Sequence, residues 1–98
     1  MSRGRFVVSP QALDDLDEIW VFLAGDSVEA ADRVETAIRG AIRKLAEFPE
    51  LGHIRDDLTD LPVKFWPVYS YLIVYNPKSD PLEIVRVLSG ALDIPEIL

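Results

Sequence analysis

A single arginine interrupts an apolar run near the end of the chain, in the segment IVRVLSGALD at residues 84–93. A guanidinium can bind a carboxylate, a phosphate or a carbonyl oxygen, and burying it without such a partner is costly because its hydration is lost. We therefore expect Arg86 either to pair within the chain, with a carboxylate such as Asp93 or with a backbone carbonyl, or to meet an acidic or carbonyl group of another molecule. The first alternative gives Arg86 a structural role, and the second makes it part of a binding surface.

Two other positions could contribute to chemistry, and both have a simpler interpretation. His53 is the only histidine, and because no second base or set of metal ligands accompanies it, we expect a surface or packing residue. Arg55 is followed by three aspartates, Asp56, Asp57 and Asp60, and we expect it to pair with one of them. The sequence therefore predicts no catalytic residue, no metal site and no cofactor.

The most acidic stretch, DDLDE at residues 14–18, lies in a segment that favours a helix. Paired carboxylates can hold a metal or act as an acid and a base, but they also favour the first turns of a helix, where the backbone dipole is positive. We expect these side chains to form a solvated helix face. The chain has no cysteine, which removes disulfides and thiolate chemistry and favours a reducing compartment such as the cytoplasm.

The net charge of −7 is distributed unevenly along the chain. Residues 1–10 carry +2, residues 11–60 carry −8 and residues 61–98 carry −1. Proteins that bind nucleic acid usually present a basic stripe to the phosphates, so we expect no direct nucleic-acid contact. With 49% hydrophobic residues and no apolar segment long enough to cross a bilayer, the composition is typical of a globular protein without a membrane role.

The N-terminal half predicts a strand followed by two helices. Residues 5–8 are a short strand candidate, and Ser9-Pro10 is a typical helix start because the hydroxyl caps free N–H groups and proline suits the first turn. Apolar residues then repeat at helical spacing until Gly25. Asp26 and Glu29 have the spacing of a reciprocal cap, and a second apolar repeat follows them. The short link predicts an antiparallel helical hairpin.

From residue 63 the periodicity changes to that of strands. Residues 63–68, 71–75 and 82–88 are three strand candidates. Pro67 places the first of them at a sheet edge or a bulge, and the third is apolar on both faces, as in an interior strand. We expect one domain, residues 1–98, of the α+β class with the order β-α-α-β-β-β, in which an antiparallel sheet carries the helical hairpin on one face.

Four stretches together resemble a known family. They are VSPQA at 8–12 with Leu16 and EIW at 18–20, LAEFPELG at 45–52, YLIVY at 71–75, and EIVRVLSG at 83–90. In this order and at these spacings, the sequence resembles the ParE/RelE superfamily of bacterial toxins from type II toxin–antitoxin pairs. It is more similar to the ParE branch, also called plasmid stabilisation proteins. The resemblance covers essentially the whole chain.

The resemblance implies a RelE/ParE-like fold, a ParD-like antitoxin whose C-terminal segment wraps the toxin in a hetero-oligomeric complex, and DNA gyrase as the target. RelE-type relatives instead cleave mRNA on the ribosome, using basic residues and a histidine or tyrosine after the last strand. Here Ser89 stands where many relatives have histidine, Ala91-Leu92 replace arginines that commonly precede Asp93, and no tyrosine follows. We expect a protein inhibitor and not an enzyme; a RelE-like ribonuclease and a non-toxic antitoxin-binding relative are the alternatives.

Nine residues are candidates for contact with the antitoxin or the target. The aromatic ones are expected mainly in the core, and an aromatic residue at a strand edge also suits a groove for a partner helix. Val21, Phe22 and the apolar tail add surface beyond what the chain can bury, unless the tail folds back onto the sheet. The candidates are Arg55 (at a usually basic family position), Trp66, Tyr71, Tyr75, Arg86, Ser89, Asp93, Ile97 and Leu98.

Overall fold

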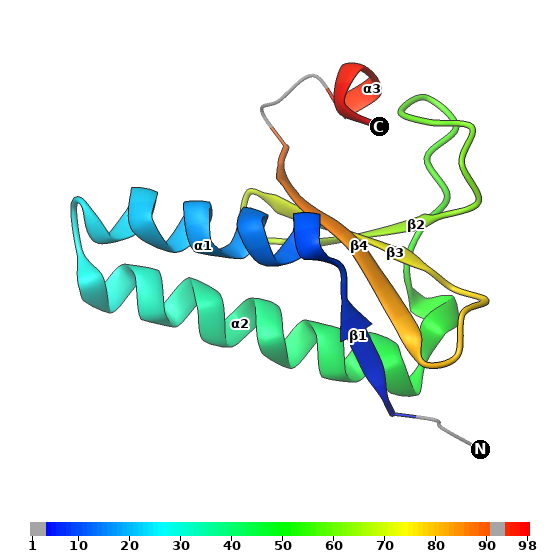
Figure 1. Ribbon diagram of the computed structural model, residues 1–98, viewed down its shortest axis with the longest axis horizontal. Helices are drawn as coiled ribbons and strands as arrows, with labels where there is room; N and C mark the ends of the chain where they lie inside the picture. Colours follow the sequence, from blue (N-terminus) through cyan, green and yellow to red (C-terminus); the bar gives the residue numbers. More distant parts are fainter. Residues whose placement is uncertain (1–3, 91–93) are drawn as a thin grey trace.

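The computed structural model describes residues 4–90 and 94–98, which form a helical hairpin beside a four-stranded sheet (Figure 1). The strands and long helices follow in the predicted order, with a 3₁₀ turn at Pro49–Leu51 and a short helix at the C-terminal end in addition. Among the described residues, no helix has the length and apolar character needed to span a membrane. The elements are β1 (Phe6–Val8), α1 (Pro10–Ala24), α2 (Val28–Glu47), β2 (Lys64–Val68), β3 (Tyr71–Asn76), β4 (Leu82–Ser89) and α3 (Ile94–Ile97).

The strands lie in the sheet in the order β1-β4-β3-β2. Strands β2, β3 and β4 form an antiparallel meander, as predicted. Strand β1 differs, because it pairs with β4 in parallel, with Phe6 opposite Leu82 and Val8 opposite Ile84. A parallel pair needs a long crossover, and the helical hairpin with the two following strands supplies it. Strand β4 is therefore interior, as its apolar run indicates.

Strand β2 forms one edge of the sheet, where Pro67 has no backbone N–H to offer a further strand. Part of this edge is covered by the preceding loop. His53 and Phe65 exchange two backbone hydrogen bonds, each with 2.8 Å between nitrogen and oxygen. The edge position predicted from Pro67 is confirmed.

Both long helices begin after a serine whose hydroxyl accepts a backbone N–H. Ser9 accepts from Ala12 at 3.0 Å, as the Ser-Pro pair predicts for α1. Ser27 accepts from Ala30 at 3.1 Å and is the cap of α2. The cap predicted from the sequence, Asp26, is therefore wrong by one residue. The extended backbone of Ser27 brings its hydroxyl over the N–H three residues ahead.

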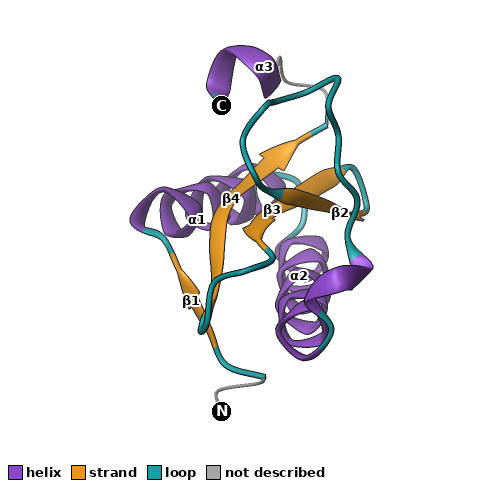
Figure 2. Ribbon diagram, turned by 90° about the vertical axis from the view of Figure 1, so that its right-hand side faces the viewer, coloured by secondary structure: helices purple, strands orange, loops and turns teal. Residues whose placement is uncertain are grey.

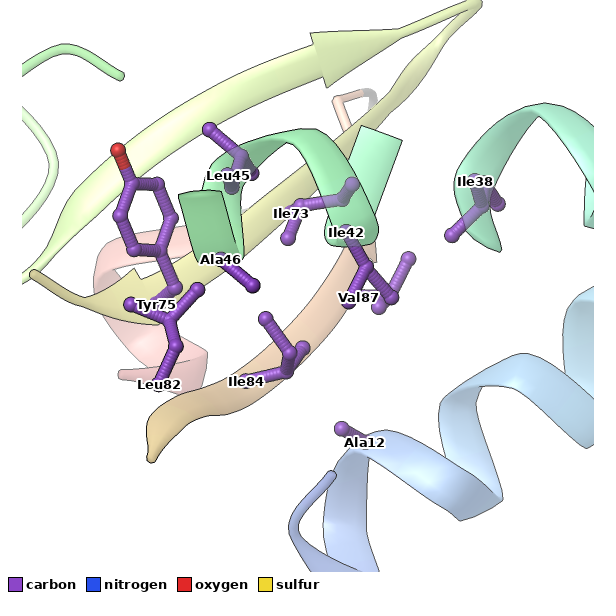
Figure 3. Close-up of a cluster of buried hydrophobic side chains, with 10 residues drawn as sticks. All are labelled: Ala12, Ile38, Ile42, Leu45, Ala46, Ile73, Tyr75, Leu82, Ile84 and Val87. Atoms are coloured by element: carbon purple, nitrogen blue, oxygen red, sulfur yellow. The ribbon is translucent and has the colours of Figure 1, made fainter. Parts of the chain in front are cut away.

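The main core fills the space between the helical hairpin and one face of the sheet (Figure 3). Ile38, Ile42 and Leu45 from α2 lie against Ile73 from β3 and Ile84 from β4, and each is at most 1% exposed. Burying an aliphatic side chain of this size contributes about 1.5–3 kcal/mol. This face therefore holds the hairpin and the sheet together.

The opposite face of the sheet carries a smaller core, covered by the loop before β2 and by α3 (Figure 2). Val74 and Leu88 alternate with residues of the main core and lie here, together with Ile94 of α3, which is 2% exposed. Leu98 packs on the same cluster, whereas Ile97 is 37% exposed. The tail thus folds back onto the sheet through Ile94 and Leu98, while Ile97 keeps part of its apolar surface in solvent.

Candidate binding site between the first helix and the last strand

A carboxylate of α1 holds Arg86, the arginine within the apolar strand β4. The Nε of Arg86 lies 2.8 Å from Oδ2 of Asp15, and its Nη2 lies 2.9 Å from Oδ1, which makes a bidentate ion pair. The same Oδ2 accepts the backbone N–H of Val87 at 2.9 Å. Three hydrogen bonds converge on one carboxylate and join the middle of α1 to β4.

This ion pair corrects two predictions from the sequence. Asp15 is 8% exposed, so it does not belong to a solvated acidic face, although Asp14 and Asp17 beside it are exposed. Among the described residues, the carboxylate that binds Arg86 is that of Asp15, 71 positions earlier in the chain. Asp93, the predicted intramolecular partner, lies outside the described residues.

Helix α1 takes this position because β1 is short. Strand β1 ends at Val8, and β4 continues past its last partner in β1 with α1 in contact beside it (Figure 1). Side chains then replace the missing strand: the Ser9 hydroxyl donates to the Val85 carbonyl at 2.7 Å, and Asp15 accepts from Val87. Buried backbone groups without partners are costly. These contacts satisfy the backbone groups of β4 on its α1 side, beyond the end of β1, while β3 pairs with its other edge.

A β-bulge in β4 lies next to the arginine. Ile84 and Arg86 oppose consecutive residues of β3, which leaves Val85 without a partner in that strand. The extra residue places both Ile84 and Val87 in the main core on the helix side. Bulges increase the local twist and redirect side chains, which accounts for an arginine that reaches α1 from the middle of an apolar strand.

The charges around Arg86 are compensated within the chain. The hydrogen bonds with Asp15 raise the pKa of Arg86 above its usual value; burial opposes this rise, and the negative charges of Asp15 and Glu18 add to it. The arginine side chain is 25% exposed. Because two carboxylates of the same chain face this cation, no acidic group from another molecule is needed to cover it.

A groove of about 370 Å³ lies over this ion pair, with walls from α1, the end of β4 and α3. Phe22 of α1 and Ile97 of α3 line it and are 76% and 37% exposed. Large apolar side chains exposed at one groove are typical of a docking surface. The groove is lined by Asp15, Glu18, Ile19, Phe22, Tyr71, Arg86, Val87, Leu88, Ser89 and Ile97.

Four of the nine predicted contact residues meet at this groove, namely Tyr71, Arg86, Ser89 and Ile97. Arg55 lies elsewhere, in the loop before β2. Its Nη2 is 2.7 Å from Oδ2 of Asp57, and this hydrogen-bonded pair raises the pKa of Arg55 and lowers the pKa of Asp57. The prediction that Arg55 pairs with a nearby aspartate is confirmed.

Trp66 and Tyr75 are held by contacts within the chain. Trp66 packs on the main core and its ring stacks on His53, with 6.2 Å between the ring centroids. Tyr75 is 0% exposed; its hydroxyl donates to the Pro49 carbonyl at 2.6 Å and accepts the Gly52 N–H at 2.8 Å. Burial raises the pKa of Tyr75. Because no part of Tyr75 reaches the surface, its prediction as a contact residue does not fit the fold.

Sequence reasoning did not single out Asp15 as a site residue, although a signal for it exists. Asp15 lies three residues after Ala12 and four before Ile19, on the face of α1 that meets the main core. A carboxylate on the apolar stripe of an amphipathic helix indicates a buried partner. That position distinguishes Asp15 from the exposed acids beside it.

The groove offers contact area to another chain. Within residues 4–90 and 94–98, no three His, Asp or Glu side chains are grouped as metal ligands. His53 is stacked on Trp66 and does not line the groove. An apolar groove beside a compensated ion pair offers contact area to another chain.

Comparisons with known proteins agree with this description. A chain of the solved structure titled "Chromosomal ParDE TA system from P. aeruginosa" has a similar fold, with a TM-score of 0.72 over 91% of this chain and 98% of that chain. At 17% identity, this likeness concerns the fold, which is the RelE/ParE-like α+β class.

The sequence comparisons then show the family. The model of the "ParE toxin of type II toxin-antitoxin system, parDE" matches residues 6–94. The Sinorhizobium fredii protein named "Putative toxin Y4kP" is 33% identical over 105 residues, across the whole of both chains. The chain belongs to the ParE toxin family and is a ParE-like toxin of the type II toxin–antitoxin class, as the sequence motifs predict.

Proposed function

We propose that this chain inhibits DNA gyrase by direct protein contact when it is free, and that a ParD-like antitoxin neutralises it in a hetero-oligomeric complex in the cytoplasm. Membership of the ParE toxin family supports the target. A chain of the same fold occurs in a ParDE TA system of P. aeruginosa, which supports the antitoxin.

The observation that carries the inhibitor proposal is that both arginines among the predicted contact residues are already paired. Cleavage of RNA needs cations that stabilise the phosphate, together with an acid and a base. Arg86 is bound by Asp15 and Arg55 by Asp57. Ser89 occupies the position where many RelE-type relatives have histidine. These groups favour protein binding over phosphodiester cleavage.

The groove over β4 supports the antitoxin part of the proposal. Phe22 and Ile97 keep apolar surface in solvent there, and a partner segment that covers them gains the free energy of removing that surface from water. Tyr71 and Ser89 line the same groove. Arg55 and Trp66 do not line it, and they are candidates for contact with gyrase.

Expression of the chain in bacteria, with and without a candidate ParD-like antitoxin, tests the proposal. We expect growth arrest with filamentation and a DNA-damage response, because gyrase is blocked, and restored growth when the antitoxin is co-expressed. A plasmid with a stop codon in place of Leu13 controls for effects of the transcript. Translation arrest with cleaved mRNA would support a ribonuclease instead, and normal growth with abundant folded chain would support a non-toxic relative.

A further inference from the structure

The charges around the groove limit what it can bind. Residues 6–32 contain seven acidic side chains and no Lys, Arg or His, so the α1 wall of the groove is acidic. Three charged residues are among those that line it, and two of them, Asp15 and Arg86, neutralise each other. Glu18 is exposed and makes no hydrogen bond or ion pair with any described residue. Glu18 also faces Arg86 electrostatically, so the two acids and one base of the lining leave the groove with a net charge of −1.

We infer that the antitoxin segment in this groove combines apolar side chains with a basic side chain that pairs with Glu18. The inference rests on the proposed antitoxin binding and specifies its chemistry. A lysine or arginine beside Glu18 gains from the surplus negative charge of α1. A carboxylate from the partner would instead be repelled by Glu18, and it would meet a guanidinium whose positive charge Asp15 already balances through a bidentate ion pair.

The apolar part of the recognition comes from several elements that line the groove. Phe22 on α1 and Ile97 on α3 keep apolar surface exposed there, and Ile19 and Leu88 belong to the same lining. The volume of about 370 Å³ is near the lower end for ligand pockets, roughly 300–1,000 Å³. A few side chains from one face of a helix or strand therefore fill it.

A second copy of this chain suits the groove less well. Any contact along α1 with another α1 brings two acidic surfaces together, because residues 6–32 carry no basic side chain. Like charges across an interface disfavour association. An α1-to-α1 dimer is therefore disfavoured, and a partner segment with the opposite charge suits the groove better.

The apolar contact is tested with adjacent residues of α1. Phe22→Asp places a charge in the groove, whereas Val21→Asp places it on the next residue, which is 66% exposed and does not line the groove. We expect the first variant to bind a purified ParD-like antitoxin that neutralises the chain at least about 30-fold more weakly, as for a central contact residue. The second variant should bind within about 3-fold of the unmodified chain. Equal affinities for both variants would overturn the assignment of this groove.

The preference for a basic partner is tested by whether neutralising Glu18 weakens or strengthens antitoxin binding. Glu18→Gln removes the net negative charge of the groove, and Asp14→Asn makes the same change on an exposed residue of α1 outside the groove. With a basic partner, Glu18→Gln weakens binding by about 3- to 10-fold at low salt, and the difference shrinks as salt screens the pair. Unchanged or tighter binding of Glu18→Gln would overturn the basic partner, since an acidic one gains when Glu18 is neutralised.

The same titrations separate this inference from the proposed function. If the unmodified chain does not bind the antitoxin, the antitoxin part of the proposed function fails and the inference fails with it, whereas gyrase inhibition is tested separately. If the unmodified chain binds and the groove variants bind equally well, antitoxin binding stands and only the groove is refuted. Circular dichroism of each variant confirms that the affinities refer to folded protein.

Discussion

Replacing Asp15 with alanine tests whether its carboxylate fixes α1 to β4. The substitution removes two hydrogen bonds with Arg86, of 2.8 and 2.9 Å, and one with the Val87 N–H, of 2.9 Å. Alanine has the highest helix propensity, so α1 itself is not weakened. Any loss of stability therefore reports on the contact between the helix and the strand.

The expected magnitude follows from the burial of the groups that lose their partner. Leaving the buried Val87 N–H without an acceptor costs about 1–3 kcal/mol. Removing one member of a fully buried ion pair costs about 3–5 kcal/mol, and solvent compensates part of this because the Arg86 side chain is 25% exposed. We expect Asp15→Ala to lower the free energy of unfolding by about 2–4 kcal/mol. For a domain of this size, the melting temperature falls by about 10–25 °C.

Urea unfolding followed by circular dichroism measures this loss, with Asp14→Ala as the matched control. Asp14 is exposed on the same helix, so its replacement changes the free energy of unfolding by less than about 1 kcal/mol. The double variant of Asp15→Ala with Arg86→Met should lose at least about 1 kcal/mol less than the sum of the single losses. The reasoning is refuted if Asp15→Ala behaves like Asp14→Ala or if the two losses are additive.

Three further predictions concern contacts that position the sheet and α1. Ser9→Ala should lower the free energy of unfolding by about 1.5–3 kcal/mol and Ser27→Ala by about 1 kcal/mol. The difference arises because each serine caps a helix but Ser9 also donates to a β4 carbonyl. Equal losses in urea titrations would contradict this second role of Ser9. Tyr75→Phe should cost about 1–2 kcal/mol at neutral pH because the buried Gly52 N–H and the partly buried Pro49 carbonyl lose their partner. Burial raises the pKa of Tyr75, so its neutral form stabilises the fold below about pH 10, and this contribution disappears as the pH rises through the folded-state pKa. Stability profiles from about pH 8 to about pH 12 should therefore converge for the unmodified chain and Tyr75→Phe, and parallel profiles would refute this. Gly52→Ala should cost about 1–3 kcal/mol because a Cβ there overlaps the Tyr75 hydroxyl; thermal melts that match the unmodified chain would contradict this close packing.

The order of the elements could be predicted because the signals for it are local. The Ser-Pro pair before α1, the apolar repeat of α2 and the proline in β2 each act within a few residues. The parallel pairing of β1 could not be predicted in this way, since a three-residue strand carries no signal for its partner. That pairing depends on the whole chain between β1 and β4.

The partner of Arg86 was harder to predict for a related reason. Asp15 lies 71 positions away, in a run of acids whose other members are exposed, and the composition of that run favours a solvated face. Asp15 could be distinguished from the exposed acids only by its position on the helix, because it shares a face with Ala12 and Ile19. The groove itself requires α3, whose four residues give no helical periodicity to detect.

Gyrase supercoiling titrated with the purified chain separates a protein inhibitor from the alternatives. We predict that relaxed plasmid stays relaxed when the folded chain is in molar excess over gyrase, and that equimolar antitoxin restores supercoiling. The heat-unfolded chain is the control for non-specific inhibition. Full supercoiling at a saturating concentration of the folded chain would contradict the proposed function.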